Sequence, residues 1–140
     1  MKITKTNIDL NDTSLALQFI SREKVKAITQ DEINLAYKIK KNIRCIQKAL
    51  RKYSFTIDKL IDGLAKKDEK DNIIRTSSGN IEFSSQKNKE KFWERRDEED
   101  EREVEFDIYG LFTKDQVELL SSDYDVSLEV LGNISWLFEE

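Results

Sequence analysis

A long run of apolar residues at alternating spacings of three and four restricts the fold of this chain more than any other feature. Its members are Ala36, Ile39, Ile43, Ile46, Leu50, Tyr53, Ile57, Leu60 and Leu64. This heptad pattern lines one face of an α-helix, and no proline interrupts it. Thr29 and Glu32 have the spacing of a capping box directly before it. The sequence therefore predicts one helix over about 30–66, on the order of 50 Å long.

A helix of that length exceeds the core that one chain of 140 residues can wrap around it. We therefore expect its apolar seam to continue onto a protein partner, most simply a second copy of the chain. This seam, predicted as an interaction surface of a homo-oligomer, comprises Ile39, Ile43, Ile46, Leu50, Tyr53 and Ile57.

Shorter elements are expected on both sides of the long helix. NDTSLALQFI predicts a short helix capped by Asn11 or Asp12, with Leu15, Phe19 and Ile20 packing inward. After the polar break KKDEKDN, the segments IIRT and IEF flank the turn SSGN and indicate a small β-hairpin.

The C-terminal third predicts two more helical regions and a strand. Ser84 or Ser85 begins a polar helix to about residue 101, and EVEFDI alternates like a half-buried strand. Thr113 and Gln116 form a second capping box, and a last helix starts at about Ser127. We predict an α+β, mostly α, single domain over 1–140. Its parts are the long helix, a small β and charged-helix part over about 72–109, and C-terminal helices over about 113–139.

The composition excludes most enzyme chemistry. Histidine is absent, so Ser-His-Asp and Cys-His sites and histidine-bound metals are excluded. Cys45 is the single cysteine, and four scattered glycines leave no P-loop or GxGxxG turn. Only carboxylate chemistry remains, with or without Mg²⁺. We therefore expect a non-enzymatic protein without a cofactor or metal. The single cysteine, with no long apolar run, favours the cytoplasm and no membrane association.

Charge is divided sharply along the chain. Residues 1–96 carry 22 basic and 13 acidic side chains, whereas residues 97–140 carry 2 and 15. The acidic part opens with a face formed by Asp97, Glu98, Glu99, Asp100 and Glu101. These carboxylates lie where the dipole of their own helix disfavours them. They lack the alternating ligands and glycine of a calcium loop, so we expect them to balance the basic long helix or to contact a partner.

Two further features are candidates for binding. A basic stripe opposite the seam could follow a phosphate backbone, although the net charge of −4 disfavours nucleic acid as a partner. The stripe comprises Lys41, Arg44, Lys48, Arg51, Lys52 and Lys59. Trp93 and Trp136 are expected to be anchors in the core or in an interface.

The order of these segments resembles a group of small proteins encoded by tailed bacteriophages and prophages. The resemblance rests on the lysine-rich AYKIKKNIRCIQKALRKY, the KKDEKDN break, the EVEFDI strand and the closing VSLEVLGNISWLFEE, over about residues 20–140. It implies a phage gene product made in the bacterial host cytoplasm, or carried in the virion, and it implies no catalytic residues.

We therefore expect an interaction or assembly module whose partner is a second copy or another phage or host protein. Two alternatives remain open. One is an anti-defence inhibitor whose acidic residues over 97–107 imitate nucleic acid and occupy a basic groove on a host protein. The other is a nucleic-acid-binding accessory protein that uses the basic stripe.

Overall fold

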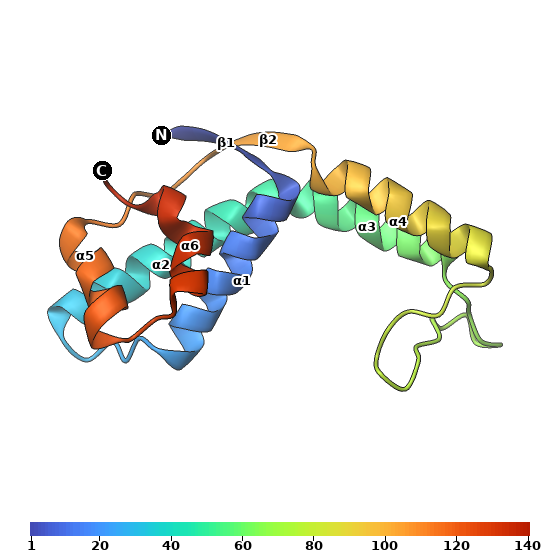
Figure 1. Cartoon of the computed structure of the whole chain (residues 1–140), viewed down its shortest axis with the longest axis horizontal. Helices are drawn as coiled ribbons and strands as arrows, with labels where there is room; N and C mark the ends of the chain where they lie inside the picture. The colour runs from blue at the N-terminus through green and yellow to red at the C-terminus, as the bar shows by residue number, and fades with distance from the viewer. The chain divides into compact units, whose positions relative to one another are not determined.

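The computed structural model describes all 140 residues, and it consists of six α-helices, two short irregular helices and one two-stranded sheet (Figure 1). The predicted α+β, mostly helical class is confirmed. The contacts divide the chain into two compact units. Unit 1 comprises Met1–Leu50 and Glu103–Glu140, and unit 2 comprises Arg51–Arg102. The single domain over 1–140 stays a prediction.

The sheet of unit 1 joins the start of the chain to the predicted EVEFDI strand. Strand β1 (Lys2–Thr6) pairs antiparallel with β2 (Glu103–Asp107), so that Lys2 lies opposite Asp107 and Thr6 lies opposite Glu103. Residues of β2 alternate between half-buried and exposed, which confirms the half-buried strand. Its partner β1 was not expected from the sequence.

Helix α1 (Asn7–Glu23) begins earlier than predicted. Thr6 caps it by accepting a hydrogen bond from the backbone N–H of Asp9, so neither Asn11 nor Asp12 is the cap. Leu15 and Phe19, which were predicted to pack inward, are exposed. The longer helix instead turns a different face toward α2 and α6. That buried face includes Leu10, Leu17 and Ile20.

The predicted single helix over 30–66 is corrected to two helices. Helix α2 (Gln30–Ala49) starts with the predicted Thr29–Glu32 capping box, and α3 (Arg51–Leu64) follows after Leu50. Leu50 has ψ −4°, outside the regular helical range, but its N–H still bonds to the carbonyl of Ile46 at 2.9 Å. Because that hydrogen bond has the i, i+4 spacing of an α-helix, the apolar residues keep their helical spacing across the break. The sequence pattern therefore does not indicate where the helix is interrupted.

The C-terminal part of unit 1 is a series of short helices. They are α5 (Lys114–Glu118), a π-helix η1 (Leu119–Asp123), α6 (Leu128–Ile134) and a 3-10 helix η2 (Ser135–Leu137). The predicted capping box of Thr113 and Gln116 and the helix start at Ser127 are both confirmed. Helix α6 packs on α1, which closes a core around α2. Its fully buried side chains include Leu35, Ile39, Ile46, Phe112, Leu120, Ile134 and Leu137.

Unit 2 is a pair of helices joined by an irregular segment. Helix α4 (Gln86–Asp100), capped by Ser85 as predicted, packs against α3. The predicted hairpin is reduced to one antiparallel bridge, between Arg75 and Ile81, around a turn in which the N–H of Thr76 bonds to the carbonyl of Asn80 at 2.7 Å. Around this turn, residues 65–83 form isolated bridges in place of two strands. No helix in either unit has the length and apolar character needed to cross a bilayer.

Candidate interaction site

The predicted seam is covered for most of its length. Ile39 and Ile46 are fully buried in unit 1, where Leu50 is nearly so, and Tyr53 is nearly buried in unit 2. Ile43 and Ile57 are half-buried. The seam therefore supplies core side chains and no continuous exposed face, and the predicted homo-oligomer stays a prediction.

The four buried positions of α2 differ from the heptad run at two places, where Leu35 replaces Ala36 and Asn42 replaces Ile43, and this brings Asn42 into the core. The fully buried Asn42 side chain donates from Nδ2 to the carbonyl of Gly110 at 2.8 Å. Its Oδ1 accepts from the backbone N–H groups of Tyr109 and Gly110 at 3.1 and 3.3 Å. The amide of Asn42 thus fixes the chain directly after β2 against α2.

This clamp supports an exposed apolar patch formed by Ile33, Tyr37 and Tyr109. Their exposed fractions are 45%, 52% and 49%, which is high for large side chains. The two tyrosine rings meet edge to face with centroids 5.7 Å apart. Lys41 Nζ lies 5.3 Å from the centre of the Tyr37 ring, on the next turn of α2. The rings are therefore held in place although they face solvent.

Lys38 ties the following loop to the same helix. Its Nζ donates to the carbonyl of Leu111 at 2.8 Å and to Oε1 of Gln116 at 3.0 Å. Gln116 Oε1 also accepts from the N–H of Thr113 within the α5 capping box. Oε1 of Gln116 therefore accepts one hydrogen bond from the charged Lys38 ammonium and one from a neutral backbone N–H. These bonds fix α5 against α2.

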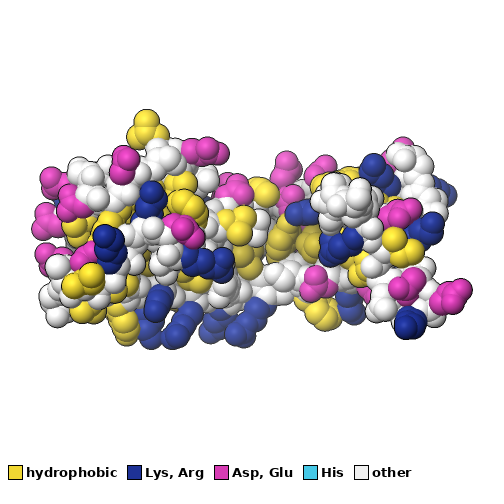
Figure 2. Space-filling view, turned by 90° about the horizontal axis from the view of Figure 1, so that it is seen from below, with side chains coloured by type: hydrophobic (Ala, Val, Ile, Leu, Met, Phe, Trp, Pro, Cys, Tyr) yellow, Lys and Arg dark blue, Asp and Glu magenta, His cyan; other side chains and the backbone are white.

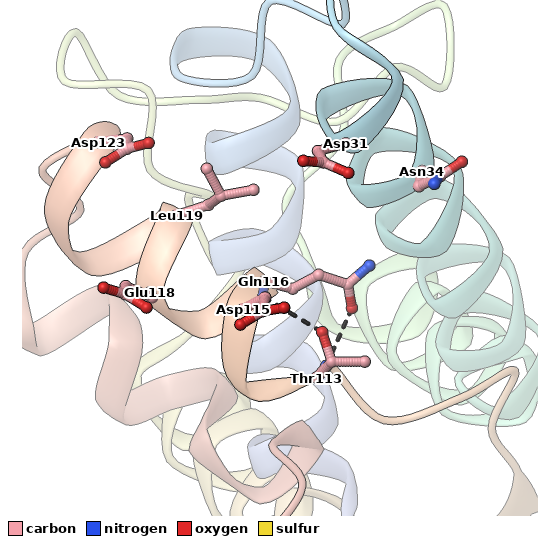
Figure 3. Close-up of a pocket in the computed structure, with 8 residues that line it drawn as sticks. All are labelled: Asp31, Asn34, Thr113, Asp115, Gln116, Glu118, Leu119 and Asp123. Carbon is pink, nitrogen blue, oxygen red and sulfur yellow. Dashed lines mark hydrogen bonds between the residues drawn. The ribbon is translucent and has the colours of Figure 1, made fainter.

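An acidic cleft of about 450 Å³ lies between α2 and the segment that contains α5 (Figure 3). Asp31 and Asn34 enter it from α2, and the other lining residues belong to the facing segment 113–123. No lysine or arginine lines the cleft. Its four carboxylates are those of Asp31, Asp115, Glu118 and Asp123.

The acidic cleft and the apolar patch form one surface of unit 1. A second hollow, of about 490 Å³, is lined by Ile33, Tyr37, Lys38 and Tyr109, and it shares Asn34 and Gln116 with the acidic cleft. Figure 2 shows acidic side chains gathered on the left of the view, where Figure 1 places α5. No group of three or more carboxylate or thiol side chains is arranged to hold a metal ion. The surface therefore combines the four carboxylates of the cleft with an exposed apolar patch.

The predicted acidic face, 97–101, ends α4 in unit 2, and several of its carboxylates have partners there. Glu98 pairs with Arg95 at 3.8 Å, and Glu99, which is nearly buried, pairs with Arg102 at 3.1 Å. Asp100 accepts a hydrogen bond from the hydroxyl of Tyr53 on α3. Asp97 and Glu101 are exposed. The Tyr53–Asp100 bond gives this face a structural role in joining α4 to α3.

The two tryptophans have different surroundings. Trp136 is half-buried in unit 1, where its Nε1 donates to Thr13 Oγ1 at 2.9 Å and Lys5 lies 5.2 Å from its ring centre. It is therefore a structural anchor of α6 and η2 on α1. Trp93 is 47% exposed on α4 and remains a candidate for contact with a ligand or partner.

The tyrosine bonds to carboxylates predict a loss of stability at alkaline pH. Burial and the Asp100 carboxylate raise the pKa of Tyr53 from 10.0 to about 12, and burial and Glu32 raise that of Tyr124 to about 12. Because the folded phenols hold their protons more tightly, this stabilisation is complete below pH 10 and is lost as pH rises through about 12. Denaturant unfolding at a series of pH values should show a smaller alkaline loss for Tyr53→Phe than for the wild type. Equal losses would contradict the assignment.

The comparisons with known proteins give no family for this chain. No protein-family model matches it, and no curated protein or solved structure is significantly similar to it. The resemblance to phage proteins therefore stays a prediction, and a function can be inferred only from the surfaces described above.

Sequence reasoning missed the surface that unit 1 exposes. Tyr37 lies one position from Ala36, the first residue of the heptad run, and Tyr109 follows a strand more than 60 residues later. The Asn42 clamp, which is formed on folding, holds the chain at Tyr109 against α2, where the two rings meet. The available signal was an aromatic residue on α2 beside the apolar stripe.

Proposed function

We propose that the protein is a non-enzymatic interaction module that binds a protein segment through the joint surface of unit 1. That surface, called the α2–α5 surface below, consists of the apolar patch Ile33, Tyr37 and Tyr109 and the acidic cleft beside it. The segment it fits carries an apolar or aromatic side chain next to lysine or arginine.

The observation that carries the proposal is the exposed tyrosine pair beside a cleft without basic residues. Tyrosine offers a large contact area at a low entropic cost, and hot spots of interfaces are enriched in it. The edge-to-face contact and the nearby Lys41 hold the rings before any partner arrives. Such preorganisation lowers the entropy lost on binding.

The acidic cleft supplies the charge selectivity of the proposed surface. Uncompensated carboxylates attract a basic segment and repel an acidic one, which sets the choice of partner and the rate of association. The aromatic half supplies most of the affinity, because exposed ion pairs contribute at most about 1 kcal/mol each.

Selection of random peptides on the immobilised protein tests this proposal, because the selection does not require the partner to be identified first. Peptides enriched on the wild type are expected to combine lysine or arginine with leucine or an aromatic residue. These peptides should no longer be enriched on the Tyr37→Ala variant. The double variant Asp115→Asn with Glu118→Gln should still select peptides with apolar residues, but without a preference for lysine or arginine.

Matched variants make the selection specific to the α2–α5 surface. Phe19→Ala removes an aromatic side chain that is equally exposed on α1, and Asp125→Asn with Glu129→Gln neutralises two exposed carboxylates outside the cleft. Both controls should select the same peptides as the wild type. Peptides selected equally well by Tyr37→Ala and by the wild type would refute the proposal.

A role of this module in phage assembly is proposed from the sequence resemblance alone. Mass spectrometry of purified virions from a strain that carries the gene tests it, with the protein expected among the structural components.

A further inference from the structure

A second cleft, of about 500 Å³, lies within unit 2 between the 76–80 turn and α4. Its lining combines three cations with three aromatic rings, and no carboxylate is among the lining residues. The six are Arg75, Lys89, Arg96, Phe83, Phe92 and Trp93. This cleft is distinct from the basic stripe predicted from the sequence, none of whose residues line it.

The aromatic rings form a supported platform. Phe92 is 2% exposed and contacts Phe83 on one side and Trp93 on the other, at centroid distances of 5.1 and 5.4 Å. Trp93 is nevertheless 47% exposed and borders the cleft. The exposed part of the tryptophan ring, held against a buried phenylalanine, is where a base could stack.

The cations of the cleft are not neutralised by carboxylates. Arg75 donates to the carbonyl of Gly79 at 3.1 Å, which leaves further N–H groups of its guanidinium to donate. Arg96 lies over Trp93 at 5.5 Å from the ring centre, and its guanidinium also interacts with the hydroxyl of Tyr53. None of Arg75, Lys89 and Arg96 is within 4.0 Å of a carboxylate oxygen, although unit 2 contains many acidic residues.

Helix α4 adds positive potential on the same side. Its first turn contains no acidic residue, and the positive end of its dipole lies at Gln86, one turn from Lys89. The chain thus places cations where its own helix disfavours them, and an anionic ligand would offset that cost.

We propose that this cleft binds single-stranded nucleic acid, with one base stacked on Trp93 and the adjacent phosphates held by Arg75, Lys89 and Arg96. Stacking on an aromatic side chain together with phosphate contacts from cations is the general mode of sequence-tolerant single-strand binding. A cleft of about 500 Å³ has the size of a small-ligand site and accommodates one nucleotide. The cleft belongs to unit 2 and is independent of the function proposed for unit 1, so either proposal can fail alone.

The test is a titration of fluorescently labelled oligothymidylate, about ten nucleotides long, followed by its anisotropy. Trp93→Ala should weaken binding roughly tenfold or more, because stacking supplies a large share of single-strand affinity. Phe55→Ala, which removes a more exposed aromatic ring from α3, should leave the affinity unchanged. Oligothymidylate should also quench tryptophan fluorescence in the wild type, whereas Trp93→Ala, which keeps Trp136, should show no quenching.

The salt dependence tests the phosphate contacts separately. Between about 50 and about 200 mM salt, Lys89→Gln should lower the slope of log affinity against log salt by about 0.7, as expected for one lost contact to a single strand. Lys91→Gln, on the same helix but outside the cleft, should change the slope less.

Four results would overturn the proposal. One is the absence of any anisotropy change at millimolar protein, and another is equal affinity for Trp93→Ala and Phe55→Ala. Displacement of the oligonucleotide by inorganic polyphosphate at the same phosphate concentration would assign a simple anion site instead. Stronger competition by a phosphopeptide than by unlabelled oligothymidylate would assign the cleft to a protein ligand.

Discussion

Replacing Phe92 by alanine is expected to destabilise unit 2 by about 3–5 kcal/mol, which is the usual cost of truncating a buried phenylalanine. The effect should be severe because unit 2 has a small core. Among the buried apolar residues of the chain, only Tyr53, Ala65 and Phe92 belong to this unit. Loss of the Phe92 ring also removes the support of Phe83 and Trp93. Hydrogen exchange of the amides in α3 and α4 measures the change.

The control for this prediction is Phe55→Ala. Phe55 lies in the same unit but is 61% exposed, so its truncation should change the stability by no more than about 0.5 kcal/mol. Similar exchange rates in the two variants would show that the helix pair is held together by something other than the aromatic core.

Asn42→Ala is expected to lower the free energy of unfolding by roughly 2–4 kcal/mol. The substitution removes three hydrogen bonds, leaves two backbone N–H groups and a carbonyl without a partner, and creates a small cavity in a fully buried position. Urea unfolding followed by circular dichroism measures the loss.

Asn34→Ala is the matched control, because it makes the same change on the same helix at an exposed site. Both variants gain the same helix propensity, so the difference between them isolates the clamp. A difference below about 0.5 kcal/mol would show that the clamp on Tyr109 and Gly110 contributes little.

Elements with local signals could be predicted from the sequence. The hydrogen bonds of the capping boxes at Thr29 and Thr113 form between residues that are three positions apart. In β2 polar and apolar residues alternate because one face of the strand is exposed and the other is half-buried. Strand β1 contains only one apolar residue, Ile3, so it shows no alternating pattern. It pairs with a strand about a hundred residues later in the chain. Such long-range pairing leaves almost no trace in a local pattern.

The candidate site depended on features that periodicity cannot show. Asn42 lies on the buried face between Ile39 and Ile46, although asparagine is mostly found at exposed positions. The helix break at Leu50 has no glycine or proline to mark it. The apolar spacing therefore predicted an interaction seam, whereas folding uses most of that seam internally and exposes Ile33, Tyr37 and Tyr109.

The most direct measurement of the proposed function is the calorimetric affinity of one selected basic–apolar peptide for the wild type and for variants of the α2–α5 surface. We expect Tyr37→Ala to weaken binding about 30-fold, equivalent to about 2 kcal/mol for a hot-spot residue. We also expect Asp115→Asn with Glu118→Gln to weaken binding severalfold at low salt and little at high salt. An affinity that Tyr37→Ala leaves unchanged, while Phe19→Ala reduces it, would contradict binding at the α2–α5 surface.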